Sequence, residues 1–427
     1  MAEILCSWGP GESRLALVAD GRVVELAVDR PTLAAGAVFM GRVVEVATRL
    51  DACFVDIGRD RPGVLKGAGG RTVGQAILVQ VQAESRPGKG PRLTADIRIP
   101  GRFFSYTGFR KGLRAPKALA AHLERCQRFL VDGDGATLRP AAPAASDEAL
   151  AADLAGLRAN WAVIEDRRKA VAAPALVWRP DAVTLMLADN PAVERVVFDD
   201  RAAFAAARHR LGDLACFAAG TVAAAEDAFA EALSPTVDLP GGGRLTIDEV
   251  TALTAIDVDS GAAAQADANR AAVAAIADAL RLRRIGGQVV IDFVSIGDRR
   301  AVQRLADDLK RAVASDPVPT HVFGVTPLGL VELTRERRGP SLADLMLDRG
   351  VGLAPEAAAL AALRRAVAEA AHRPGRALAL VVAPRVAAAL AARPEAVAEA
   401  SARIGRPLAL RPEPGREPED FLIEEVT

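Results

Sequence analysis

Two apolar segments that each contain an aspartate, joined by one helix-like segment, constrain this sequence more than any other feature. Residues 252–258 and 288–294 have the composition of buried strands. The intervening residues, about 265–284, carry Ala, Leu and Ile at helical spacing, and Gly286-Gly287 is expected to end that helix. A helical crossover joins parallel strands of one sheet. The segment therefore predicts a strand–helix–strand unit with an aspartate on each strand.

The positions of the two aspartates predict a site. Asp257 lies at the carboxyl end of the first strand and Asp292 near that of the second, where open α/β sheets bind ligands. In one interpretation the carboxylates hold Mg²⁺, which offsets the cost of burying a charge in an apolar strand and can activate water for phosphodiester hydrolysis. Asp259 is then a third ligand or orients Asp257. In the other interpretation the acids cap helices or pair with arginine.

The remaining text alternates between strand-like and helix-like patterns. Five short apolar segments between residues 38 and 97, separated by Gly and Pro, predict a small closed barrel such as an OB fold. Alternating apolar residues around Asp20-Gly21 predict a hairpin. Further candidates are helices at 116–130 and 146–172 and the strands ALVWRP, AVTLML and VERVVFDD within 174–200. This alternation indicates a multidomain α/β protein.

Residues 85–117 are basic and aromatic. They contain nine Lys and Arg side chains, among them Lys89, Arg92, Arg102 and Arg114. Four aromatic residues are interleaved, namely Phe103, Phe104, Tyr106 and Phe109. A cationic groove with aromatic platforms is typical of single-strand binding, because phosphates need neutralising and bases need stacking partners. The alternative is a solvated basic loop whose aromatic side chains enter the core.

Length and composition set outer limits. A chain of 427 residues is expected to form two to four compact units. Its 54 basic and 54 acidic side chains give a formal net charge of +0, so any nucleic-acid surface must be local. The four cysteines form no CxxC pair, which argues against a disulfide framework or a cysteine zinc site. Without a signal-peptide pattern or a membrane-spanning apolar run, a cytoplasmic location is expected.

Several stretches resemble the ribonuclease E/G family of bacterial endoribonucleases in collinear order. The closest are LPGGGRLTIDEVTALTAIDVDSG, LRLRRIGGQVVIDFV and LGLVELTRERRGPSL, and GRVVEVATRLDACFVDIG and GKGPRLTADIRIPGR are similar to its OB-fold region. The resemblance implies an RNase H-like fold with an inserted RNA-binding barrel, a sensor region for the RNA 5′ end, a DNase I-like catalytic domain and a small C-terminal α/β domain. The implied parts are RNase H-like 1–37 and 173–235, OB fold 38–98, 5′ sensor 99–172, catalytic domain 236–345 and C-terminal domain 346–427.

The motif matches also imply roles for individual residues of the catalytic domain. Asp257 and Asp292 take the positions of the family's magnesium ligands, with Mn²⁺ as an alternative metal. Asp259 stands where many members have Asn, which supports the first ligand. Arg335 matches a basic position of the catalytic domain.

Further matches imply contacts with RNA. Phe54 and Lys89 match barrel positions that contact RNA. Arg139 falls near the family's phosphate-sensing arginine, and Gly112 with Arg114 resembles the other half of that pocket.

Three departures from the family pattern bear on function. The zinc-link cysteines are missing after the PSL of the catalytic domain, so no zinc is expected and any homo-oligomer would form without it. Val64 replaces an aromatic residue of the barrel, and Thr251 replaces an acid. Two hypotheses remain: a magnesium-dependent endoribonuclease that cuts single-stranded RNA to 5′-phosphate and 3′-hydroxyl ends, or an RNA-binding paralogue with weak or no cleavage. A metal-free structural α/β protein survives only if the basic aromatic segment is buried.

Overall fold

The computed structural model describes residues 2–84, 90–220, 223–295, 299–348 and 352–426. The chain forms two compact units, which are described separately. One comprises residues 1–31 with 194–427, and the other comprises residues 32–193. The protein is a mixed α/β protein, as the sequence predicts.

A closed five-stranded barrel is the centre of the unit formed by residues 32–193. Its strands pair in the ring β4-β5-β6-β8-β7, and β7 pairs again with β4. The bounds are β4 Val38–Ala47, β5 Ala52–Asp56, β6 Gly63–Lys66, β7 Ala76–Ala83 and β8 Arg92–Thr94, with a 3₁₀ turn η1 at Thr48–Leu50. Inward-facing residues such as Cys53, Val55 and Leu65 fill the interior. The barrel is therefore confirmed and is consistent with an OB-like domain.

A second, four-stranded sheet in this unit packs against a long helix. The sheet has the order β11-β12-β10-β9. Helix α2 (Asp147–Ala170) begins at Ser146, whose side chain accepts from the Ala149 N–H, and it buries Leu154 and Trp161 on its inner face. The other bounds are β9 Ile99–Pro100, β10 Phe104–Thr107, β11 Gly112–Arg114, β12 Gly135–Leu138, η2 Lys117–His122, α1 Leu123–Gln127 and η3 Ala142–Ala144. The helix expected at 116–130 is thus a 3₁₀ turn followed by one short α-helix.

The segment AVTLML was expected to be a strand and is instead helix α3 (Ala182–Asp189). Asp181 caps it by accepting a hydrogen bond from the Thr184 N–H at 2.7 Å, and this local cap outweighs the strand propensity of the apolar run. The preceding strand β13 (Ala175–Trp178) pairs with β4 of the barrel. Both elements belong to residues 32–193, although the prediction grouped 173–235 with 1–37.

The other unit begins with a sheet whose strands come from the two stretches of chain on either side of residues 32–193. Its order is β15-β14-β1-β2-β3, and β1 pairs in parallel with β14. The bounds are β1 Ala2–Gly9, β2 Glu12–Ala19, β3 Arg22–Asp29, β14 Arg195–Phe198 and β15 Ala215–Phe217, with α4 Arg201–Leu211, η4 Gly212–Leu214 and α5 Ala223–Leu233. Asp20 and Gly21 both have positive φ, at 50° and 78°. The hairpin predicted there is confirmed.

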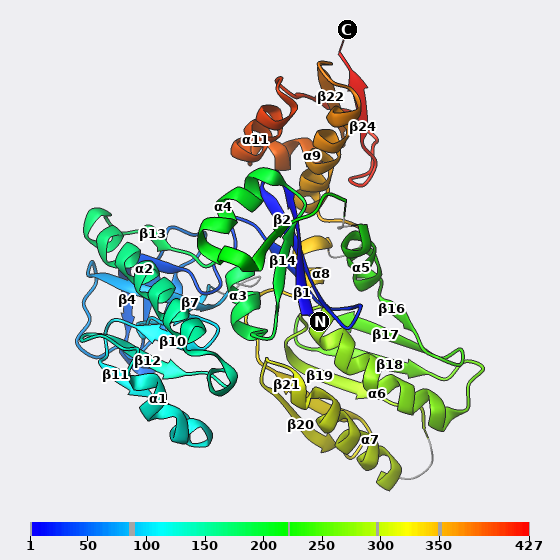
Figure 1. Cartoon of the computed structure of the whole chain (residues 1–427). Helices are drawn as coiled ribbons and strands as arrows, with labels where there is room; N and C mark the ends of the chain where they lie inside the picture. Colours follow the sequence, from blue (N-terminus) through cyan, green and yellow to red (C-terminus); the bar gives the residue numbers. More distant parts are fainter. Residues whose placement is uncertain (1, 85–89, 221–222, 296–298, 349–351, 427) are drawn as a thin grey trace. The chain divides into compact units, whose positions relative to one another are not determined.

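A six-stranded sheet, β16-β17-β18-β19-β21-β20, carries the strand–helix–strand unit. Helices α6 (Gln265–Leu282) and α7 (Arg299–Ala312) lie along one face of it (Figure 1). The strands are β16 Thr236–Asp238, β17 Arg244–Glu249, β18 Thr254–Asp259, β19 Gly287–Asp292, β20 Thr320–Val325 and β21 Val331–Arg335, with η5 at Val313–Ser315. The predicted first strand, crossover helix and second strand are all present.

The end of α6 differs from the prediction. The helix stops at Leu282, and Arg284, not a glycine, adopts the left-handed conformation with φ 56°. The Ile285 N–H then donates to the Leu280 carbonyl at 3.0 Å, which is the 6→1 hydrogen bond of a Schellman cap. The glycine pair has another role, because a Cβ on Gly287 would lie 2.4 Å from the Arg337 side chain.

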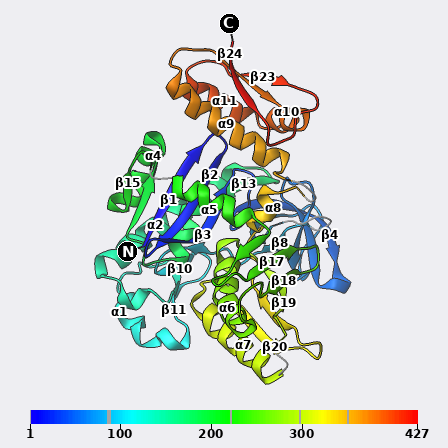
Figure 2. The ribbon, with the colours of Figure 1, turned by 90° about the vertical axis from the view of Figure 1, so that its right-hand side faces the viewer.

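The C-terminal region of this unit is small and rich in alanine. Figure 2 shows α9, α10 and α11 together beside β23 and β24. The bounds are α8 Leu342–Met346, α9 Pro355–His372, α10 Pro384–Ala391, α11 Pro394–Ile404, β22 Leu378–Val382, β23 Ala409–Pro412 and β24 Leu422–Glu425. In the part of the chain that the structure describes, no helix has the length and apolar character needed to cross a membrane.

Candidate active site: an acid pair on an open sheet face

Asp257 and Asp292 are direct neighbours across two parallel strands. Strand β18 pairs with β19, and the register places Asp257 opposite Asp292. Adjacent strands lie about 4.8 Å apart, and paired residues point to the same face of a sheet. The expectation that the crossover brings the two acids together is therefore met at the level of the backbone.

Both carboxylates lie on the face of the sheet that the helices leave open. Burial alternates along β18, with Ile256 and Val258 buried and Asp257 exposed between them. Asp292 is likewise exposed beside the buried Ile291. The apolar sequence around each acid predicts a buried charge, and this prediction is wrong, because each strand buries only its other face. The acids are accessible to an ion and to a substrate.

The structure gives the oxygen atoms of the pair no ion-pair partner among the described residues. Among the described residues, neither Asp257 nor Asp292 forms an ion pair, so the alternative of pairing with arginine is not what this part of the chain shows. Two adjacent carboxylates and open solvent are the donor set that Mg²⁺ uses when it retains most of its waters. Within the described ranges, no group of three or more His, Cys, Asp or Glu residues is placed to hold a metal. The residues fit a two-carboxylate site completed by waters.

Asp259 shares the open face but has a local structural contact. It is exposed and lies two residues beyond Asp257 on the same side of β18. Its Oδ1 accepts a hydrogen bond from the Gly261 N–H at 2.9 Å. This contact shapes the turn after the strand, and Asp259 is not part of a three-residue ligand group. The role of Asp259 in orienting Asp257 stays a prediction.

Arg335 does not join the acid pair. On β21 it follows Val331 and Leu333, which pack into the core, so it points to the helix-covered face. Its guanidinium donates to Asp316 through Nε at 2.8 Å and Nη2 at 3.1 Å, and Nη1 donates to the Ile285 carbonyl at 2.8 Å. This side chain is buried, hydrogen-bonded to Asp316 and Ile285, and on the opposite face of the sheet. The structure gives it a structural role, and its predicted catalytic role stays a prediction.

Thr246 is a neighbour of the pair that the sequence argument missed. It lies opposite Asp257 in the antiparallel register of β17 and β18. Thr246, Asp257 and Asp292 thus form one row across three strands. The register that selects Thr246 depends on the exact length of the turn between β17 and β18, which the sequence pattern does not specify.

The barrel presents two of the predicted RNA-contacting residues on its outer surface. Phe54 lies opposite Val64, and Val64 lies opposite Arg92, so the three form a row across β5, β6 and β8. Arg92 is exposed and Phe54 is half-buried, while their neighbours on β5 fill the interior. Lys89, predicted to contact RNA, lies outside the described residues.

The residues matched to the 5′-phosphate pocket share one sheet face. Gly112 (φ 87°) and Arg114 are exposed on β11, where Arg114 lies opposite Thr137 of β12. Arg139 follows two residues later and so faces the same side as Thr137. Its guanidinium already donates to the Ala188 carbonyl at 2.8 Å and to Asp189 at 3.1 Å.

Arg102 is half-buried and hydrogen-bonded within its own unit. Its Nη2 donates to the carbonyls of Pro191 and Val193, and burial lowers the pKa of its guanidinium. These contacts give Arg102 a structural role, and its predicted contact with RNA stays a prediction.

The aromatic residues of the basic segment divide sharply. Phe103, Phe104 and Tyr106 are buried in the core of their unit, as the alternative interpretation expected. Burial, with the hydrogen bond that the hydroxyl donates to Asp134, raises the pKa of Tyr106 to about 12. Phe109 is the exception at 48% exposed. The segment is not wholly buried, which removes the condition set for a purely structural protein.

Comparisons with known proteins agree with this architecture. The sequence profile described as "Ribonuclease E/G family" matches residues 112–338, more than half of the chain. The chain is 29% identical to Ribonuclease E of Synechocystis over 76% of this chain and 55% of that protein. It is 28% identical to Ribonuclease G of Haemophilus influenzae and of Escherichia coli K12, over 81% of this chain and 82% of each relative. The chain thus spans about half the length of the ribonuclease E relatives that it matches.

A barrel in one unit and an acid pair on an open sheet face in the other define a multidomain α/β protein with a candidate hydrolytic site. The profile match contains both aspartates. The chain belongs to the ribonuclease E/G family.

Proposed function

We propose that the protein is an endoribonuclease that cuts single-stranded RNA, with Asp257 and Asp292 holding a Mg²⁺ ion at the cleavage site. The observation that supports this most is the register of β18 and β19, which sets the two exposed carboxylates side by side. The names of the relatives, Ribonuclease E and Ribonuclease G, agree with it. Because the chain covers about half of the ribonuclease E relatives, the activity is assigned here as a proposal.

The chain's own residues prepare the reaction by position. The acids project from strands that are anchored by Ile256 and Ile291 in the core, so little reorganisation is needed when a phosphodiester approaches. The bound metal supplies water activation and charge stabilisation for hydrolysis to a 5′ phosphate and a 3′ hydroxyl. Mn²⁺ has the same preference for oxygen ligands and is expected to substitute.

Contacts with the rest of the RNA are assigned to the other unit. On the barrel, Phe54 offers a face for a base and Arg92 a charge for phosphate. On the small sheet, Gly112, Arg114 and Arg139 share a face that suits a terminal phosphate, and Arg139 also donates to Asp189 at 3.1 Å. A cytoplasmic location, the six predicted domain boundaries and a homo-oligomer without a zinc link remain predictions.

Substitution of one acid tests the proposal. Asp292→Asn removes a negative charge from the open face and leaves the buried side of β19 unchanged. Cleavage of a 5′-monophosphorylated, A/U-rich oligonucleotide in Mg²⁺ should fall at least a hundredfold, on the order of losing one charge-stabilising group. RNA binding in EDTA should be retained. The matched control is Asp267→Asn on α6, whose side chain is 68% exposed and pairs with Arg270 one turn away.

The result separates the two hypotheses. Magnesium-dependent cleavage that disappears in Asp292→Asn and persists in Asp267→Asn supports the enzyme. Full activity in Asp292→Asn would overturn the metal assignment. The absence of a third acidic ligand among the described residues favours the second candidate, an RNA-binding paralogue. Tight RNA binding by the wild-type chain with no turnover in Mg²⁺ or Mn²⁺ would establish that candidate.

A further inference from the structure

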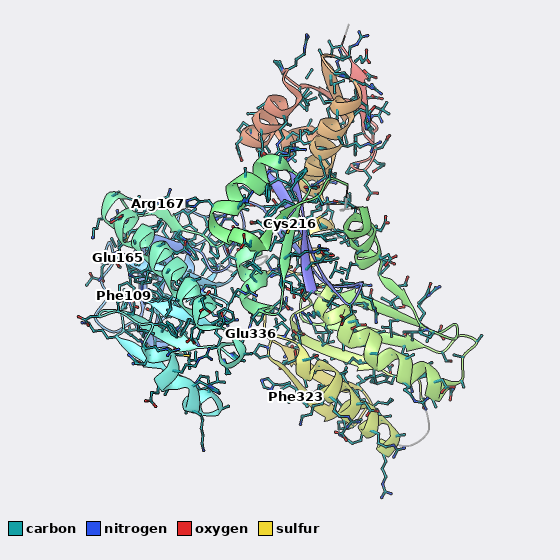
Figure 3. All side chains as sticks on the ribbon, in the orientation of Figure 1. Phe109, Glu165, Arg167, Cys216, Phe323 and Glu336 are labelled. Carbon is teal, nitrogen blue, oxygen red and sulfur yellow. The ribbon has the colours of Figure 1, made fainter. Side chains whose placement is uncertain are left out.

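Phe109 is an exposed aromatic residue in a segment whose other aromatic residues are buried. It lies on the loop between β10 and β11, and it is 48% exposed while the aromatic residues just before it are buried. Figure 3 labels it beside Glu165 and Arg167, which come from the end of α2. Exposing a phenyl ring forgoes burial worth about 1.5–3 kcal/mol, so the arrangement calls for a reason.

Contacts with Trp161 of α2 fix the position of the Phe109 ring. Phe109 meets Trp161 of α2 edge to face, with centroids 5.0 Å apart and an interplanar angle of 86°. Gly108 lies so close to the same indole that a Cβ there would be 2.1 Å from its Nε1. The Phe109 N–H donates to the Thr107 hydroxyl at 3.4 Å. The loop is therefore fixed against the helix, and the ring does not depend on a ligand for its orientation.

Three basic side chains lie on the ring or next to it in the sequence, and each is paired with an acid. The Arg168 guanidinium carbon lies 5.9 Å from the ring centroid, and Glu165 holds that side chain at 2.7 Å. Arg110 and Lys111 follow Phe109 directly and stay exposed. They pair only weakly, with Asp96 at 3.4 Å and Asp132 at 3.7 Å. Residues 107–117 contain four basic side chains and no acid.

We propose that Phe109 is a stacking platform for one base of a single-stranded RNA, with the surrounding cations holding the flanking phosphates. A preoriented ring loses little entropy when a base stacks on it, and every base has a face to offer, so the contact is tolerant of sequence. The adjacent cations attract the backbone. This inference rests on the proposed function for the identity of the ligand, and it adds a binding residue outside the acid pair and the barrel.

The test measures binding without cleavage. Full-length protein in EDTA is titrated with two fluorescent oligomers of about ten nucleotides, one oligoadenylate and one abasic backbone of the same length. The variants are Phe109→Leu, which keeps apolar bulk, and Phe109→Trp, which keeps a stacking face. The control is Val163→Ala, an apolar α2 side chain of similar exposure at 45%. Thermal unfolding of each variant verifies that the unit is intact.

Base stacking predicts a specific pattern. Phe109→Leu should weaken oligoadenylate binding about five- to tenfold, while Phe109→Trp and Val163→Ala stay within about twofold of wild type. All four proteins should bind the abasic oligomer alike, and the salt dependence should not change, because no phosphate contact is lost. Oligoadenylate affinity in Phe109→Leu equal to wild type overturns the proposal. So does an equal loss on both oligomers, which would indicate a collapsed loop.

The outcome is separable from that of the proposed function. Cleavage of the oligoadenylate by wild-type protein in Mg²⁺ is assayed in parallel with Asp292→Asn. If Phe109→Leu loses base-dependent binding while no protein cleaves, the platform stands and the nuclease assignment fails. If wild type cleaves and Phe109→Leu binds normally, the platform fails and the nuclease assignment stands.

Discussion

At the scale of single residues, strand alternation decides which charges face solvent. Asp257 and Asp292 fall on exposed positions of β18 and β19, whereas Arg335 falls on a buried position of β21. Arg335 and Asp316 are each 6% exposed at their side chains and form two hydrogen bonds with one another. The same sheet therefore carries accessible acids on one face and a closed ion pair on the other.

This ion pair should contribute to stability and have no direct part in cleavage. Asp316→Asn leaves the Arg335 charge buried without its counter-charge, which typically costs 3–5 kcal/mol. The free energy of unfolding, followed in urea, should fall by about that amount. In Asp238→Asn, whose partner Arg244 is 58% exposed, the loss should stay below about 1 kcal/mol. Cleavage lost in Asp316→Asn while its folded structure persists would instead restore a catalytic role to Arg335.

The alternation of buried and exposed residues along the strands also limits how much of the site the sequence could predict. The crossover rule brings Asp257 and Asp292 to neighbouring strands without knowledge of the register. It cannot say that they are exposed, because an apolar run such as QVVIDFV suits a strand buried on both faces equally well. Phe109 was named only as one of four aromatic residues, since its exposure depends on how the loop packs on Trp161.

At the scale of elements, helix α2 is stabilised more by the packing of its buried face than by the helix propensity of its residues. Leu150, Leu154 and Leu157 recur at helical spacing and are buried. The outer face carries Gly156, where an added Cβ would meet nothing within 4 Å. Glycine in a helix interior costs about 1 kcal/mol relative to alanine, so this position is a local weakness that the buried leucines outweigh.

Gly156→Ala should therefore stabilise the protein by about 0.5–1 kcal/mol. The opposite sign is expected for Gly21→Ala, which is equally unobstructed but has φ 78°. There the alanine side chain strains the left-handed turn, and a loss of about 1 kcal/mol is expected. Urea unfolding of the two variants provides the comparison. Equal effects of both substitutions would show that backbone conformation is not the deciding term.

The elements that the sequence misjudged share a physical cause. The helix α3 has an apolar run as typical of a strand, and the Asp181 cap decides the outcome. The end of α6 was assigned to a glycine pair, whereas Arg284 adopts the left-handed cap conformation. In both cases a short-range hydrogen bond from a backbone N–H outweighs the conformational propensity of the residues involved.

At the scale of the whole molecule, a buried charge network joins the beginning of the chain to its C-terminal part. Glu12 of β2 has a side chain only 1% exposed and binds Arg14 at 2.8 Å and Arg30 at 2.7 Å. Arg364 of α9 donates to the Glu12 carbonyl at 3.1 Å and to the Ser7 hydroxyl at 2.8 Å. Arg364 thus links residues more than 350 positions apart, and Arg14 and Arg30 also pair with Glu226 and Glu356.

Protonation of Glu12 should couple this network to pH. Burial alone would raise the pKa of Glu12, but Arg30 and Arg14 outweigh it and hold the pKa below its ordinary value. The folded state therefore binds fewer protons than the unfolded state just below the ordinary pKa, about 4.3. The contribution of ionised Glu12 to stability is complete above that pH and is lost as the pH falls through the lowered pKa of Glu12.

Glu12→Gln tests both the size and the pH dependence of that contribution. Near pH 7 the variant leaves buried Arg14 and Arg30 with only the partly exposed Glu226 and Glu356 as counter-charges. Its free energy of unfolding should therefore be about 3 kcal/mol lower than that of wild type. The gap should narrow as the pH falls below about 4, because Glu12 of the unfolded wild-type chain then takes up a proton that the folded state binds only at lower pH. Glu424→Gln, which is 47% exposed, should show a gap below about 1 kcal/mol near pH 7. A Glu12→Gln gap that stays constant with pH would mean that its effect comes from packing and not from charge, and the C-terminal region would then be held by its apolar contacts.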